Sequence, residues 1–118
     1  MDTTRYSVVA GALLASTLAA TPVISVHSDY HFGFAPATIP LRIHVEPHAD
    51  NRVLCIEYDG GMYSRSCQDH VGLDAPITLW KTYTNVSAGD YTLVAAIIRK
   101  DKSQRHAVIH FRVLSSRP

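Results

Sequence analysis

The chain has 118 residues, of which 11 are lysine or arginine and 10 are acidic, so its formal charge is +1. This length allows one small domain and is too short for a cofactor-binding α/β enzyme. The near-zero charge excludes a broadly polyelectrolyte-binding chain, and the 47% hydrophobic content excludes intrinsic disorder. Formal charges are absent between Arg5 and Asp29, so an apolar segment precedes an ordinary soluble domain.

The N-terminal segment has the order of a secretory signal, with a weak basic start and then an apolar run over residues 6–20. Small residues at Thr17 and Ala19, or at Val23 and Ser25, are candidate cleavage positions. The alternative is a membrane anchor, because residues 8–26 are uncharged over about the length of a minimal span. Proline and many small or hydroxylated residues make the segment a poor permanent span, so we expect cleavage.

These observations predict a secreted or periplasmic protein of the cell envelope, with a membrane contact only if the N-terminal segment is retained. We expect a signal segment over 1–28 and a linker rich in proline and aromatic residues over 29–38. A single domain then follows over 39–114, and a frayed tail over 115–118.

From residue 41 onward, apolar and polar residues alternate with period two, which is typical of half-buried strands. No sustained helical period follows Ser28. Six or seven short strands at short intervals predict an all-β, antiparallel sandwich preceded by a signal helix. The expected strands cover 41–45, 54–58, 63–68 near a sheet edge, 77–84, 91–99 and a last strand that ends near 113.

The chain has two cysteines, Cys55 and Cys67, and an even number in an exported chain favours a disulfide. If residues 60–62 form a three-residue loop, Cys55 lies directly opposite Cys67; a two-residue turn would instead place Leu54 there. The bridge closes a short loop and should contribute about 2 to 3 kcal/mol to stability.

The segment 86–91, Val-Ser-Ala-Gly-Asp-Tyr, has the spacing Leu-x-x-Gly-x-Tyr with Val86 at the first position. It resembles the tyrosine corner of fibronectin type III and other immunoglobulin-like sandwiches, in which a tyrosine hydroxyl returns to the preceding backbone. The resemblance assigns the corner to Gly89 and Tyr91. Leu93 stands where antibody domains have a cysteine, so the nearest likeness is a bacterial-style accessory domain. Such domains bind proteins or sugars or act as spacers, and the resemblance implies no catalytic residue.

Seven histidines raise the question of a metal site. Two pairs are spaced i, i+4, but such positions lie about 13 Å apart on a strand, so neither pair converges on one ion. Only a cross-strand pair remains, namely His44 with His110 if the first and last strands are neighbours. We therefore predict no metal, with this pair as the alternative. Gly-x-Ser-x-Gly and phosphate-loop motifs are absent, so we predict neither an enzyme nor a cofactor.

The C-terminal region is basic, and its predicted hairpin tip would suit an anionic glycan. The tip residues are Arg99, Lys100, Lys102 and Arg105. The alternative is a hairpin that only aids solubility. No aromatic side chain interleaves with the tip, which disfavours a nucleic-acid partner. A glycosylation sequon begins at Asn85 and has meaning only in a eukaryotic secretory route.

The last feature of the sequence is an apolar outer face on the predicted strand 91–99. If Tyr91 faces the core, alternation places Val94, Ala96 and Ile98 on the opposite face, and Val108 extends them. Such a stripe predicts a protein partner, a second copy of the chain, or cover from the aromatic segment 30–34. The sequence thus predicts an exported, non-catalytic binding or structural accessory domain. The alternative is a small metal- or anion-binding exported protein.

Overall fold

The computed structural model describes residues 22–30 and 32–115, and these residues form eight strands and no helix. The predicted signal helix lies outside them, as do the last residues of the predicted tail. No helix in the described ranges is long and apolar enough to cross a membrane. The strands are β1 (Ile24–His27), β2 (Phe32–Phe34), β3 (Ala37–Val45), β4 (Asn51–Asp59), β5 (Tyr63–Asp69), β6 (Thr78–Val86), β7 (Gly89–Arg99) and β8 (Gln104–Leu114).

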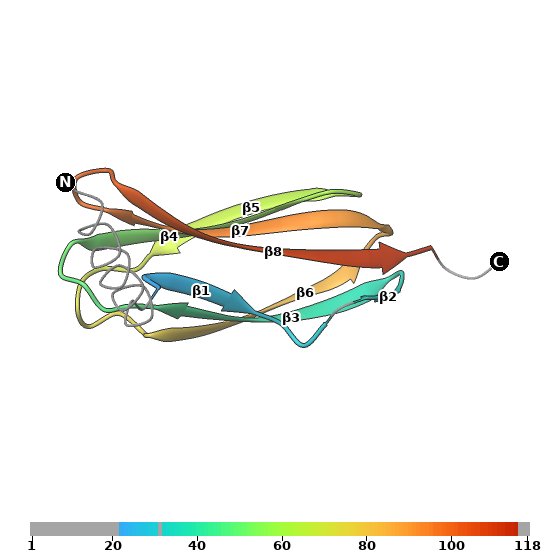
Figure 1. Cartoon of the computed structure of the whole chain (residues 1–118), viewed down its shortest axis with the longest axis horizontal. Helices are drawn as coiled ribbons and strands as arrows, with labels where there is room; N and C mark the ends of the chain where they lie inside the picture. The colour runs from blue at the N-terminus through green and yellow to red at the C-terminus, as the bar shows by residue number, and fades with distance from the viewer. Residues whose placement is uncertain (1–21, 31, 116–118) are drawn as a thin grey trace, which may run out of the picture.

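The strands form two sheets that pack face to face (Figure 1). One sheet has three strands in the order β1-β3-β6, and the other has five in the order β2-β8-β7-β4-β5. All pairs are antiparallel except β2 with β8, which is parallel. The all-β, immunoglobulin-like sandwich is confirmed. The predicted number of six or seven strands is wrong, as is the wholly antiparallel pairing.

The additional strands, β1 and β2, have only four and three residues. β1 pairs with β3 and buries Ile24, although it lies within the range 1–28 predicted as signal. β2 pairs with the end of β8, and β3 begins at Ala37, so half of the predicted linker belongs to the sheets. Both strands form by backbone pairing at the edge of a sheet. Each is too short for the alternation of apolar and polar residues to be recognised in the sequence.

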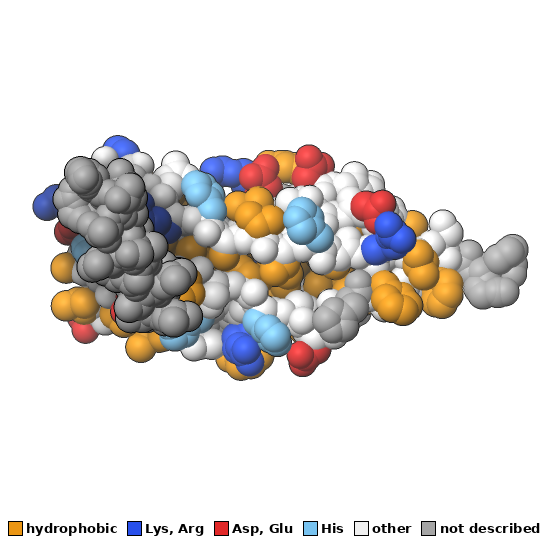
Figure 2. Space-filling model, in the orientation of Figure 1, with side chains coloured by type: hydrophobic (Ala, Val, Ile, Leu, Met, Phe, Trp, Pro, Cys, Tyr) orange, Lys and Arg blue, Asp and Glu red, His pale blue; other side chains and the backbone are white. Residues whose placement is uncertain are grey.

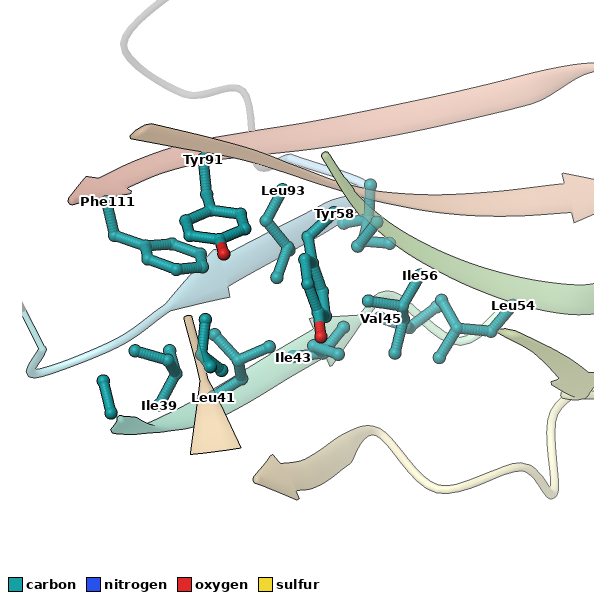
Figure 3. Close-up of a cluster of buried hydrophobic side chains, with 14 of the residues drawn as sticks. Ile39, Leu41, Ile43, Val45, Leu54, Ile56, Tyr58, Tyr91, Leu93 and Phe111 are labelled. Atoms are coloured by element: carbon teal, nitrogen blue, oxygen red, sulfur yellow. The ribbon is translucent and has the colours of Figure 1, made fainter. Parts of the chain in front are cut away.

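The core lies between the sheets and comes from the alternating faces predicted for the long strands (Figure 3). The burial of β3 alternates strictly along its whole length, with Ile39, Leu41 and Ile43 inside. Across the core, β4 and β7 contribute the largest groups of facing side chains. These are Leu54, Ile56 and Tyr58 from β4, and Tyr91, Leu93, Ala95 and Ile97 from β7.

The corner predicted at Tyr91 is present. Its hydroxyl donates to the Ser87 carbonyl oxygen at 2.7 Å. Its ring stacks on Phe111 with centroids 5.0 Å apart and meets Tyr58 edge-on at 5.6 Å. The ring is therefore buried while its polar atom is satisfied by the backbone, as the resemblance implied.

Three glycines let two turns touch at the corner. Gly89 has φ of 157°, which disfavours any residue with a side chain, and a Cβ there would meet the backbone of Gly61. A Cβ on Gly61 would in turn meet the Ala88 carbonyl oxygen, and one on Gly60 the Asp90 carbonyl oxygen. The β4–β5 turn therefore packs directly against the β6–β7 connection.

Candidate binding surface

The four residues predicted as a partner surface share the outer face of the five-stranded sheet. Each lies in a cross-strand row, since residues directly opposite in antiparallel strands point to the same side. Val94 has Val108 on one side and Glu57 on the other, and Ala96 has His106 and Cys55. Val94 and Ile98 are half-buried, Val108 is half-exposed, and Ala96 is buried between its two neighbours.

The disulfide predicted between Cys55 and Cys67 is present and belongs to the same face. The two residues oppose each other in the β4–β5 ladder, as the three-residue loop required, and their Cα atoms are 4.0 Å apart. Since Cys55 also lies opposite Ala96 on β7, the bridge carries the apolar row out to the edge strand β5.

A shallow hollow of about 130 Å³ lies on this face. Its floor is apolar, and its rim carries the opposite charges of Glu57 and Arg65, which face each other across β4 and β5. The rim on the β8 side is polar, with His106 and Gln104. The complete lining is Cys55, Glu57, Arg65, Val94, Ala96, Ile98, Gln104 and His106.

The aromatic segment 30–34 does not cover this face. The Tyr30 ring packs edge-on against Phe111 at 6.0 Å, and its hydroxyl donates to the Arg112 carbonyl oxygen at 3.1 Å. β2 then continues alongside residues 112–114 of β8. The segment adds an edge strand beside the C-terminal end of β8 rather than lying over Val94 and Ile98, so the cover hypothesis is wrong.

The four basic tip residues have different surroundings. Arg99 is half-buried, and its Nε donates to the side-chain oxygen of buried Asn51 at 3.2 Å. Lys100, Lys102 and Arg105 are exposed. Lys100 also donates its backbone N–H to Asp50 at 2.7 Å, which fixes the hairpin to the β3–β4 turn. Arg99 thus has a structural contact, and three cations remain at the surface.

The alternative metal pair is not brought together. His44 lies on β3 in the three-stranded sheet, and His110 lies on β8 in the five-stranded sheet, so the condition that their strands be neighbours fails. His110 Nδ1 instead shares a hydrogen bond with Thr92 Oγ1 at 3.2 Å. Within 22–30 and 32–115, no group of three or more histidine, cysteine or acidic side chains is arranged to hold a metal.

Sequence reasoning missed one exposed aromatic site. Trp80 lies on the outer face of the three-stranded sheet with 73% of its surface exposed. The Arg42 guanidinium carbon, from the adjacent strand, lies 5.9 Å from the ring centroid. Beside them is a hollow of about 100 Å³ that includes His27 and Asp29. The signal was available in the alternation of β6, where Leu79 and Tyr83 face inward and Trp80 must face outward.

No protein-family model matches the chain, and no curated protein matches its sequence. Solved structures with a similar fold include the CARDB domain of a Pyrococcus furiosus protein, in complex with di-metal ions. It is 12% identical, with a TM-score of 0.54 over 80% of this chain and 93% of that one. A superoxide reductase (neelaredoxin) from Ignicoccus hospitalis is 11% identical, with a TM-score of 0.53 over 86% of this chain and 87% of that one. At these identities the likeness extends to the fold alone.

Proposed function

We propose that the chain is an exported, non-catalytic accessory domain that binds a protein partner on the outer face of its five-stranded sheet. The tyrosine corner and the sandwich support its place among immunoglobulin-like accessory domains. One observation carries the binding proposal, namely that half-buried Val94 and Ile98 and half-exposed Val108 share one face beside a charged rim.

The outer face of β3 shows what a solvated sheet surface looks like in this same molecule. There every outward residue is exposed, and Arg42 and His44 are polar. The outer face of β7 begins with the polar residues Asp90 and Thr92 and then has valine, alanine and isoleucine at positions 94, 96 and 98. An apolar centre with opposite charges at its rim is the composition of a protein interface, and the two charges would fix the register of a partner.

Two features support export. The first is the disulfide, because such bonds persist in oxidising compartments. The second is the signal-like order of the N-terminal segment. We place the cleavage before Val23, since the Glu46 N–H donates to the Val23 carbonyl oxygen at 2.8 Å and Ile24 pairs with Val45. Cleavage after Ser25 would remove half of β1.

A matched pair of double variants tests the binding face. Val94→Lys with Ile98→Lys places two charges on the outer face of β7. Thr78→Lys with Thr82→Lys places two charges at the same i, i+4 spacing on the exposed face of β6. Both proteins are compared with the wild type by circular dichroism, size-exclusion chromatography and cross-linking in the native extract.

We expect the β7 double variant to lose a cross-linked partner that the wild type and the β6 double variant both retain. If the lost species is a dimer of the chain, the same face binds a second copy instead. Retention of every cross-linked species by a folded β7 double variant would refute the assignment of this face.

A further inference from the structure

Three connections meet at one end of the sandwich, which we call the loop end. They are the β3–β4 turn over 46–50, the β5–β6 loop over 70–77 and the β7–β8 hairpin over 100–103. Buried Asn51 joins all three. Its side chain donates to Glu46 O at 3.1 Å and accepts from Arg99, and its backbone carbonyl accepts from Gly72 N at 3.0 Å.

The β5–β6 loop presents three large apolar side chains to solvent at this end. Val71 is 53% exposed, Leu73 is 65% exposed and Ile77 is 46% exposed. The backbone of this loop is held in place, because Gly72 and His70 both donate to the start of β4. Its apolar side chains are therefore displayed by a fixed scaffold, and burying them would release a free energy that the isolated domain does not use.

The neighbouring hairpin is basic. Residues 99–105 hold four basic side chains and one acid, Asp101, whose carboxylate accepts from Ser103 N at 2.9 Å within the turn. Lys100 and Lys102 project at the tip, and Arg105 follows on β8. Figure 2 shows hydrophobic and basic side chains together at the end of the molecule opposite the C-terminus. The other two connections carry three acids, Glu46 and Asp50 in the β3–β4 turn and Asp74 in the apolar loop, so the positive charge at this end is confined to the hairpin.

The chain also enters the sandwich at the loop end. Ile24 pairs with Val45, the last residue of β3, and Val23 accepts a hydrogen bond from Glu46. Three residues, 21–23, separate Ile24 from the apolar run 6–20. Three residues span at most about 10 Å. While that run is inside a bilayer, during export or as an anchor, the loop end therefore faces the membrane surface.

We propose that the loop end docks on an anionic membrane surface. Val71, Leu73 and Ile77 enter the boundary between headgroups and acyl chains, and Lys100 and Lys102 contact lipid phosphates. A bilayer suits this surface because the apolar and the basic side chains lie on neighbouring loops at one end of the sandwich. The apolar run 6–20 joins the domain at the same end. The outer face of the five-stranded sheet stays free for a partner, so the proposal goes beyond the binding function above.

The test places a tryptophan reporter in the full-length chain. Trp80 is the single tryptophan, so Trp80→Phe clears the background. Leu73→Trp then reports from the apolar loop, and Val108→Trp, also at an exposed apolar position, reports from the outer sheet face. Each protein is reconstituted in phosphatidylcholine–phosphatidylglycerol vesicles with and without brominated acyl chains.

We expect the emission of the residue-73 reporter to shift to the blue and to be quenched by brominated lipid, while that of the residue-108 reporter is unchanged. Val71→Trp repeats the measurement if the first reporter fails to fold. In a flotation assay of the processed protein, Lys100→Gln and Lys102→Gln should each weaken vesicle association about fivefold. Equal quenching at positions 73 and 108, or no quenching at 73, would overturn the proposal. Val94→Lys should leave the quenching unchanged, which separates this site from the partner face.

Discussion

The two ends of the sandwich are closed in different ways. At the corner end, backbone packs on backbone, because Gly60, Gly61 and Gly89 leave no room for a side chain. At the loop end, one buried amide, that of Asn51, holds three connections together, and large apolar side chains remain outside. The corner end is therefore stable only if its glycines carry no side chain, whereas the loop end is stabilised by the hydrogen bonds of one side chain. We expect the corner end to tolerate far less change.

The largest effect should come from Gly61→Ala. The new methyl group would overlap the Ala88 carbonyl oxygen and approach the Tyr91 hydroxyl, and neither can move without opening the corner. We expect a loss of about 3 kcal/mol in the free energy of unfolding, measured by urea denaturation. Gly33→Ala is the matched control, since the atoms nearest to its Cβ would all belong to the Tyr30 side chain, at 3.2 Å or more. Equal stability of the two variants would contradict the close packing of the corner.

At the loop end, Asn51→Ala should have the next largest effect. It removes an acceptor from Arg99 and a donor from the Glu46 carbonyl, and it leaves a small void. We expect a loss of about 2 kcal/mol, because the half-buried Arg99 can still reach water. Gln104→Ala, an exposed amide at the same end, should change stability little. Hydrogen exchange should show that the loss comes with faster opening of the β7–β8 hairpin.

Tyr91→Phe tests the corner with a smaller change. The ring stays and the hydrogen bond to Ser87 O is lost. Because Ser87 is exposed, its carbonyl can be hydrated instead, so we expect a loss of only about 1 kcal/mol by thermal unfolding. If Tyr91→Phe were as stable as the wild type, the hydroxyl would have no role in closing this end.

The smallest effect is a pH dependence at the loop end. His70 is buried, and burial lowers its pKa from the usual 6.5. Its Nδ1 makes no hydrogen bond within the described part of the chain. The unfolded chain binds a proton at His70 more readily than the folded chain does. The contribution of neutral His70 to the free energy of unfolding is therefore complete above about pH 6.5. It is lost as the pH falls towards the lower pKa of the folded state. His70→Gln should flatten the stability profile over this range, measured by urea denaturation at a series of pH values.

The sequence predicted what depends on local alternation. The inward faces of β3 and β7, the opposition of Cys55 to Cys67 and the corner at Tyr91 all follow from periods and spacings within one or two strands. The outer face of β7 followed from the same alternation.

What depends on distant contacts was missed. The three-residue loop over 60–62 gives no sign that the glycines at 60 and 61 contact the corner about 30 residues later. β1 and β2 are too short to show a period, and their partners lie far along the chain. The loop end was missed because its members come from three separate connections, and only the fold shows that these are adjacent.

The parallel pairing of β2 with β8 has a consequence for the order of folding. Phe32 lies beside Arg112, and the Tyr30 hydroxyl bonds a carbonyl 82 residues away. Contacts of such separation form late, since a long loop must close before they stabilise anything. A chain that emerges from its N-terminus first can complete the three-stranded sheet once β6 is out. Tyr30 and Phe32, however, have their partners on the last strand, so the sandwich is complete only when nearly all of the chain has emerged.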